Sequence, residues 1–129
     1  MCIRDRSWMV PLPFEYDKDL PGYKKMLDLF DDPAHANENL PKAQALKDAT
    51  MAHFILEHSM PNHTFLHING AYHSDNYEGI LWYLKKQRPD LNVATISSKE
   101  QQNISELEVE HVGIADFIII IPEGMTKTY

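Results

Sequence analysis

The spacing of apolar residues along the chain predicts two helices in the first half. The stronger pattern runs from Leu40 to His58, with Pro41 near its start and a second proline shortly after its end. A shorter pattern runs from Asp19 to Phe30, where Pro21 suits the first helical turn. A polar stretch that contains one proline separates the two predicted helices.

A third helix is predicted from Asn76 to Arg88. Asp75 and Glu78 have the spacing of a capping box at its start, and basic residues gather at its end before a proline. The predicted apolar stripe of this helix consists of Tyr77, Ile80, Leu81 and Leu84.

Three short runs rich in apolar residues predict strands. They are Thr64–Asn69, Asn92–Ser97 and Ala115–Ile121, and the last is apolar along its whole length, as expected for a strand covered on both faces. Strand, helix and strand over 64–97 form a βαβ unit, which implies parallel pairing. The predicted fold class is therefore α/β, with a parallel or mixed sheet flanked by helices. Residues 99–112 fit a short helix or an edge strand equally well.

Composition and charge narrow the choice of function. The 129 residues are enough for one domain, and 43% hydrophobic with 24% charged residues is the ordinary balance of a globular protein. The longest apolar run, Phe117–Ile121, is far shorter than the ~20 residues of a membrane span. Twelve basic and nineteen acidic residues give a net charge of −7, which argues against nucleic acid as a partner. Cys2 is the only cysteine, so neither a disulfide framework nor a thiolate metal site is expected.

The first six residues are expected to be non-native. The string MCIRDR (residues 1–6) resembles translated adapter sequence of the kind found at the ends of assembled environmental sequences. It has neither the apolar core nor the cleavage site of a signal peptide. The native domain is therefore taken as residues 7–129.

The segment from Gly70 to Asp75 is the first candidate site. It follows a predicted parallel strand and leads into a helix N-terminus, where α/β proteins commonly bind ligands. Gly70 would allow a sharp turn with positive φ, and His73 could then bind a metal, exchange a proton or bond an anionic ligand. In the alternative interpretation Gly70 only makes the turn and His73 packs locally.

Two polar side chains on the longest predicted helix are the second candidate. Gln44 and Asp48 project into its broad apolar face, where an unpaired carboxylate would cost several kcal/mol. They either bond backbone groups of a neighbouring loop or form one wall of a polar pocket beside His73. Both interpretations remain open at this point.

Further histidines and tyrosines lie nearby. Five histidines fall within twenty-one residues, but their spacing does not place two on one helix face, and most are expected to be surface or core residues. Tyr72 and Tyr77 flank His73, and a tyrosinate can ligate haem iron. Alternatively, these aromatic side chains belong to a seam between helix and sheet.

Three ordered stretches resemble a known family. AQALKDATMAHFI (43–55), FLHINGAYHSDNYEGILWYLKK (65–86) and ADFIIIIPEGMTKTY (115–129) are similar to the ChaN-like haem-binding uptake family of the Tiki/TraB superfamily. The resemblance implies that residues 7–129 are the C-terminal portion of a single ChaN-like domain, and so an incomplete copy of a larger domain. The family's first motif, Gly-Glu-x-His, does not occur here and is expected upstream of residue 7.

The resemblance implies a set of site residues. The second family motif falls on Gly70 and His73, and the helix motif falls on Gln44, Asp48 and Met51. Of these residues, Gly70, His73, Gln44 and Asp48 are expected to bind the cofactor haem, with tyrosine ligation for which Tyr72 and Tyr77 are the candidates. As an alternative cofactor, a divalent metal is expected at His73.

The resemblance also implies a function and a location. Family members are similar in binding haem as cofacial pairs within a homodimer, with a histidine from the other subunit. The expected function is haem binding for iron or haem uptake at the cell envelope, in a lipoprotein that works with outer-membrane uptake machinery. The alternatives are a metal-dependent hydrolase acting on a peptide or ester, with His73 as ligand or acid–base group, and a fragment with an incomplete, inactive site.

Overall fold

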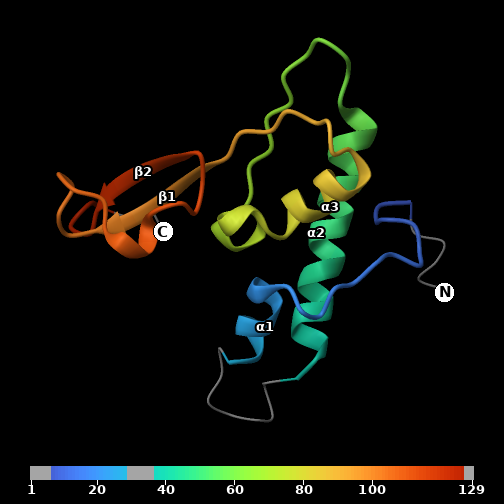
Figure 1. The fold of residues 1–129 in the computed structure, drawn as a ribbon, viewed down its shortest axis with the longest axis horizontal. Coiled ribbons are helices and arrows are strands. Elements are labelled where there is room, and N and C mark those ends of the chain that lie inside the picture. The colour runs from blue at the N-terminus through green and yellow to red at the C-terminus, as the bar shows by residue number, and fades with distance from the viewer. Residues whose placement is uncertain (1–6, 29–36, 127–129) are drawn as a thin grey trace.

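The computed structural model describes residues 7–28 and 37–126 and shows a helical part beside a small sheet (Figure 1). The helices α1 and α3 both contact α2, the longest helix. The sheet lies away from α2, at the opposite side of the molecule (Figure 1). In chain order the helices and strands are α1 (Pro21–Leu27), α2 (Asn39–His58), α3 (Ile80–Gln87), β1 (Ile96–Gln101) and β2 (Phe117–Pro122).

Helix α2 confirms the strongest sequence prediction. It runs from Asn39 to His58, one residue longer than expected, with Pro41 in its first turn. Its buried face is lined by small side chains that let neighbouring helices approach closely, and it also contains two polar residues. The buried residues are Pro41, Gln44, Ala45, Asp48, Ala49, Ala52 and Ile55.

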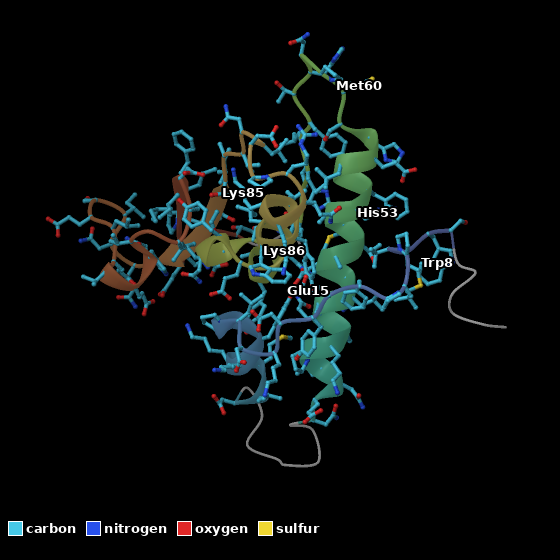
Figure 2. The ribbon with its side chains drawn as sticks, turned by 45° about the vertical axis from the view of Figure 1, so that its right-hand side comes forward. Trp8, Glu15, His53, Met60, Lys85 and Lys86 are labelled. Atoms are coloured by element: carbon cyan, nitrogen blue, oxygen red, sulfur yellow. The ribbon has the colours of Figure 1, made fainter. Side chains whose placement is uncertain are left out.

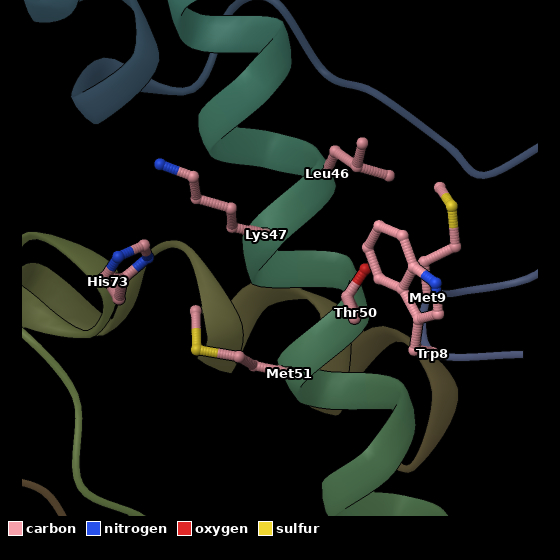
Figure 3. Close-up of a pocket in the computed structure, with 7 residues that line it drawn as sticks. All are labelled: Trp8, Met9, Leu46, Lys47, Thr50, Met51 and His73. Atoms are coloured by element: carbon pink, nitrogen blue, oxygen red, sulfur yellow. The ribbon is translucent and has the colours of Figure 1, made fainter. Parts of the chain in front are cut away.

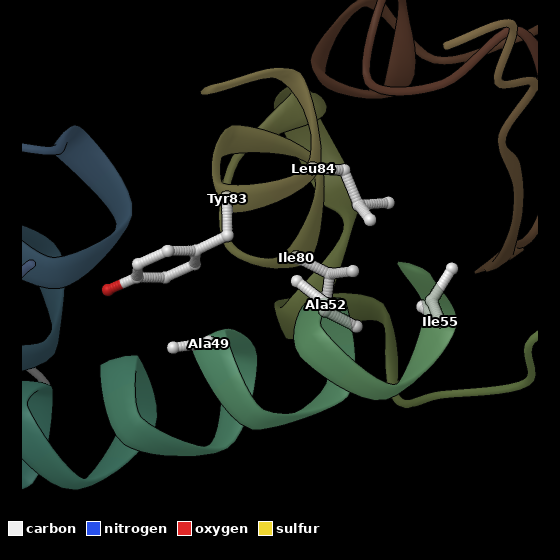
Figure 4. Packing of buried hydrophobic residues seen from close by; sticks show 6 residues of the cluster. All are labelled: Ala49, Ala52, Ile55, Ile80, Tyr83 and Leu84. Carbon is white, nitrogen blue, oxygen red and sulfur yellow. The ribbon is translucent and has the colours of Figure 1, made fainter. Parts of the chain in front are cut away.

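Two apolar clusters hold the helices together. The larger lies between α2 and α3 (Figure 4), and the smaller joins α1 to α2. The first consists of Ala49, Ala52, Ile55, Ile80, Tyr83 and Leu84, and the second of Tyr23, Met26 and Ala45. Helix α1 lies within the helix predicted from Asp19 to Phe30, whose expected end at Phe30 is outside the described residues. Residues 1–6, expected to be non-native, are also outside the described residues.

The segment before α1, residues 7–20, is held to α2 and α3 by hydrogen bonds and an ion pair. The backbone N–H of Val10 donates to Thr50 Oγ1 at 3.3 Å, and the Tyr83 hydroxyl donates to the carbonyl oxygen of Glu15 at 2.9 Å. Lys86 forms an ion pair with the Glu15 carboxylate, and Figure 2 shows the two residues beside each other. This segment also carries Trp8, which is largely exposed and lines a pocket together with residues of α2.

Helix α3 is shorter than predicted. It begins at Ile80, because positive φ angles at Asn76 (59°), Tyr77 (60°) and Gly79 (55°) interrupt the helical backbone. The predicted capping box is therefore wrong. The carboxylate of Asp75 instead accepts hydrogen bonds from Ser97 and Lys99, and Glu78 accepts one from the backbone N–H of Gly22. Of the predicted apolar stripe, Tyr77 is exposed, whereas Ile80, Leu81 and Leu84 are buried.

The sheet confirms the α/β class but not the predicted βαβ unit. Strands β1 and β2 pair in parallel, with Ile96 opposite Phe117 and Gln101 opposite Pro122. Residues 64–69 form neither helix nor strand and do not join this two-stranded sheet, so the strand predicted there is wrong. The predicted strand at 92–97 overlaps only the start of β1. An apolar run predicts strand-like backbone, but a strand also needs a neighbour with which to exchange hydrogen bonds.

The expectation that the last strand is covered on both faces is also wrong. Phe117 is 62% exposed and Ile119 56% exposed, and among the described elements the extensive contacts of β2 are with β1. The region left open in the sequence, 99–112, contributes the end of β1 and a short 3-10 turn at Val109–His111. Within the part of the chain that the structure describes, no helix is both long and apolar enough to cross a membrane.

Asp116 ties the start of β1 to the start of β2. Its Oδ2 atom accepts hydrogen bonds from the backbone N–H and the hydroxyl of Thr95, at 2.7 and 2.9 Å. The Tyr77 hydroxyl donates to Oδ1 at 3.2 Å. The pKa of the Asp116 carboxyl is lowered, first by the Thr95 backbone N–H and then by the Thr95 hydroxyl, because both donate to the charged form.

The cluster between α2 and α3 is tested by truncation of Leu84, which is buried. Leu84→Ala is expected to lower the free energy of unfolding by about 2–5 kcal/mol, since it leaves a cavity in the core. The matched control is Leu66→Ala, because Leu66 is 78% exposed. The control should stay within about 0.5 kcal/mol of the wild type in urea unfolding. Equal losses at the two positions would contradict the described core.

The hydrogen bonds of Asp116 predict a pH dependence. The folded pKa lies below the unfolded value of about 3.9, so the contribution is present above that pH and is lost as the pH falls through the folded pKa. Asp116→Asn is therefore expected to lower the free energy of unfolding at neutral pH. The difference from the wild type should shrink below about pH 4 in denaturant titrations at several pH values. A difference independent of pH would exclude this origin.

Candidate functional site

His73 lies in a 3-10 turn, Ala71–His73, that precedes α3. The turn starts at Gly70, whose carbonyl oxygen accepts from the His73 backbone N–H at 3.0 Å. The positive φ predicted for Gly70 is wrong, because its φ is −67° and its ψ 144°. The placement of His73 at the carboxyl end of a parallel strand is also wrong, since residues 64–69 form no strand.

The imidazole of His73 instead meets the polar side chains of α2. Its Nδ1 atom lies 2.5 Å from Asp48 Oδ1 and 2.8 Å from Gln44 Nε2. Asp48 is fully buried, whereas the side chain of His73 retains 21% of its accessible surface. Of the two interpretations of Gln44 and Asp48, the structure therefore favours the one that groups them with His73 rather than with backbone atoms of a loop.

Tyr23 of α1 completes this group, and the sequence analysis missed it. Its hydroxyl donates to Asp48 Oδ2 at 2.8 Å, and its side chain is buried. Tyr23 belongs to the apolar stripe of α1, so the sequence indicates only a core residue there. The one available clue was the buried carboxylate itself, which requires donors without indicating where they come from.

Burial sets the electrostatics of the group. It raises the pKa of the Asp48 carboxyl, while hydrogen bonds from His73 and Tyr23 stabilise the charged form and act in the opposite direction. Burial also raises the pKa of Tyr23 far above its usual value, and the negative charge of Asp48 adds to the effect. Tyr23 therefore remains a protonated donor throughout the physiological pH range.

We assign a proton to His73 Nδ1, since an ionised carboxylate at 2.5 Å can only accept. The Gln44 atom nearest to Nδ1 is Nε2, at 2.8 Å, so with this tautomer we assign the carboxamide the reverse orientation, in which its oxygen faces the Nδ1 proton. Among the described residues, Nε2 of His73 has no hydrogen-bond partner. A neutral imidazole whose Nδ1–H is held by a carboxylate is the usual form of a histidine metal ligand.

A largely apolar pocket of about 440 Å³ adjoins this group (Figure 3). It lies along α2, with His73 at one end and Trp8 and Met9 at the other (Figure 3). Lys47 is the only lysine or arginine among the described residues that line it. The lining residues are Trp8, Met9, Leu46, Lys47, Thr50, Met51 and His73.

The other predicted ligands lie apart from this pocket. Tyr72 and Tyr77 are both exposed, and neither lines it. Their hydroxyls donate to the carbonyl oxygen of Gly22 and to Asp116, respectively. Of the remaining predicted residues, His73 and Met51 line the pocket, whereas Gly70, Gln44 and Asp48 do not. Cofactor binding stays a prediction for all of them.

A divalent metal at His73 also stays a prediction. Among residues 7–28 and 37–126, one group of three potential metal ligands is found, and it consists of Glu108, Glu110 and His111 rather than residues around His73. His67 is a further histidine of note, because its Nε2 is buried without a hydrogen-bond partner in the described part of the chain. Burial lowers the pKa of His67, with the charge of His73 as a smaller cause, so this ring favours its neutral form.

The absence of a side chain at Gly79 allows this residue to pack closely against His73 and Asp48. A Cβ atom there would lie 2.4 Å from the carbonyl oxygen of His73 and 3.2 Å from Asp48 Oδ2. Gly113 also has a positive φ, of 79°, but a Cβ atom at that position would meet nothing within 4 Å. Both positions carry the penalty of a positive φ, and Gly79 adds the steric clash and a ψ of −118°, which side chains other than glycine rarely adopt together with that φ.

Gly79→Ala is expected to destabilise the protein more than Gly113→Ala. The control should cost roughly 1–2 kcal/mol, because only the left-handed backbone is penalised. The Gly79 variant adds a clash that must move the His73 turn away from α2. Chemical denaturation measures both, and equal losses would show that the described packing around Gly79 is wrong.

Comparison with known proteins identifies one family. The family described as haem-binding uptake, Tiki superfamily, ChaN matches residues 3–84, which include the whole His73 group and α2 but neither strand. No curated protein and no solved structure matches the chain. The match spans more than half of the 129 residues, and the chain belongs to the ChaN haem-binding uptake family of the Tiki superfamily.

Proposed function

We propose that this protein binds haem at the pocket beside His73, with the His73 imidazole as the axial ligand. The observation that carries the proposal is the His73–Asp48 hydrogen bond at 2.5 Å, in a chain of the haem-binding uptake family. A carboxylate on Nδ1 fixes the tautomer and the orientation of the ring, and it raises the basicity of Nε2. Bound haem would supply an iron atom that accepts such a nitrogen as an axial ligand.

The residues around the pocket fit a porphyrin in chemistry. About 440 Å³ lies within the range of ~300–1,000 Å³ typical of small-molecule sites. The indole of Trp8 and the side chains of Met9, Leu46 and Met51 offer apolar surface to a flat macrocycle. Lys47 offers a positive charge to a propionate carboxylate.

The wider role follows from the same proposal. Family membership supports haem or iron uptake. We include in the proposal a location at the cell envelope, in a lipid-anchored parent protein that meets outer-membrane uptake machinery. A homodimer in which Tyr72 or Tyr77 provides a tyrosine ligand also belongs to it, since both side chains are exposed.

Haem titration of the purified chain tests the proposal. We expect a saturable Soret band in the wild type and an affinity at least about tenfold weaker in His73→Ala, because the axial nitrogen is lost. The matched control is His58→Ala, which removes an exposed histidine at the end of α2 and should leave the affinity unchanged.

Two results would contradict haem binding at His73. One is the absence of any Soret band in the wild type, and the other is equal affinity in the wild type and His73→Ala. A parallel titration with zinc or manganese distinguishes haem binding from the alternative function, a metal-dependent hydrolase. Stoichiometric metal uptake that depends on His73, without haem uptake, would favour the metal-dependent hydrolase of the wider superfamily.

A further inference from the structure

We propose that Tyr23 is a positioning residue of the haem site, which acts on His73 through Asp48. The hydroxyl of Tyr23 holds one carboxylate oxygen of Asp48, and the other oxygen holds Nδ1 of His73. The proton of the imidazole is thereby kept on Nδ1, and Nε2 is left for the ligand. This inference rests on the proposed function and adds a residue to it.

The three side chains come from three separate elements. Tyr23 belongs to α1, Asp48 to α2 and His73 to the turn before α3. Tyr23 is 3% exposed and Asp48 0% exposed, so water does not compete for the hydrogen bond between them. The two hydrogen bonds therefore fix the position of the His73 imidazole relative to α2, although part of the ring remains exposed.

Two further contacts hold α1 to residues 71–78, the segment in which His73 lies. The backbone N–H of Gly22 donates to Glu78 Oε2 at 2.6 Å, and the Tyr72 hydroxyl donates to the carbonyl oxygen of Gly22 at 2.9 Å. The ring of Tyr23 also packs on Tyr16, with 5.9 Å between the ring centroids. These contacts position the Tyr23 phenol independently of Asp48, so the direction of its hydroxyl is fixed.

The geometry explains why a hydroxyl is needed at this position. Each oxygen of Asp48 has a side-chain donor, Tyr23 at Oδ2 and His73 at Oδ1. Without the phenol hydroxyl, Oδ2 would be buried with no donor, and the carboxylate would have to turn or admit water. Either movement displaces Oδ1 and with it the imidazole that it orients.

Tyr23→Phe tests the proposal, because it removes the hydroxyl and keeps the ring. The control is Ser59→Ala, since Ser59 is half-buried and its hydroxyl donates to the backbone carbonyl oxygen of Ile55 at the end of α2, away from Asp48. In the protein without haem, nuclear magnetic resonance should show a strongly deshielded Nδ1 proton of His73. We expect that resonance to shift in Tyr23→Phe and to stay in place in Ser59→Ala.

Haem affinity gives the second measurement. Tyr23→Phe should weaken haem binding about tenfold, as expected for loss of the hydroxyl that holds Asp48, and Ser59→Ala should leave the affinity unchanged. In an Asp48→Ala background the same Tyr23→Phe substitution should cause no further loss, since Tyr23 has no carboxylate left to hold. A packing role would instead give the same loss in both backgrounds.

The outcomes separate this inference from the proposed function. A His73 resonance and a haem affinity that are both unchanged in Tyr23→Phe overturn the role of Tyr23, as does an equal loss of affinity in the two backgrounds. If the wild type takes up no haem, the proposed function fails, and the resonance of the ligand-free protein still decides whether Tyr23 acts on His73. A wild type without the deshielded Nδ1 proton overturns the chain of hydrogen bonds itself.

Discussion

The fully buried carboxylate of Asp48 is the constraint around which the helical part of this protein is arranged. A buried charge needs donors on both oxygens, because removing one partner leaves an uncompensated group that water does not reach. The donors at Asp48 come from α1 and from the turn that holds His73. The same residue that stabilises the packing of three elements therefore also orients the imidazole.

The small side chains of α2 make this arrangement possible. Ala45 packs against α1 and Ala52 against α3, so both elements approach the helix axis closely on the face that carries Asp48. Gly79 likewise allows close packing next to the turn that carries His73, because any side chain at this position would clash with His73 and Asp48. The alanines of α2 and Gly79 therefore allow both the close packing of the helices and the short hydrogen bonds around Asp48.

The sequence allowed part of this arrangement to be predicted. The position of Asp48 and Gln44 on the apolar face of α2 follows from helical periodicity, and a buried carboxylate there already implied a partner. The choice of His73 as that partner came from a local motif, although the strand expected to carry it is not formed. Tyr23 could not be predicted, because periodicity shows that a residue is buried without showing which atom it meets. The apolar run at 115–121 correctly predicted the strand β2, but its composition did not indicate that β1 is its partner, because pairing depends on both strands.

The segment from Asp75 to Tyr77 links the site to the sheet. Asp75 accepts hydrogen bonds from Ser97 and Lys99 of β1, and the backbone N–H of Asn76 donates to the carbonyl oxygen of Ile114 at 2.8 Å. The Tyr77 hydroxyl reaches Asp116. Three consecutive residues are thus bound to the sheet, while His73, two positions earlier, is bound to α2. The backbone between these contacts has positive φ angles at Asn76 and Tyr77, and α3 therefore starts later than its apolar pattern predicts.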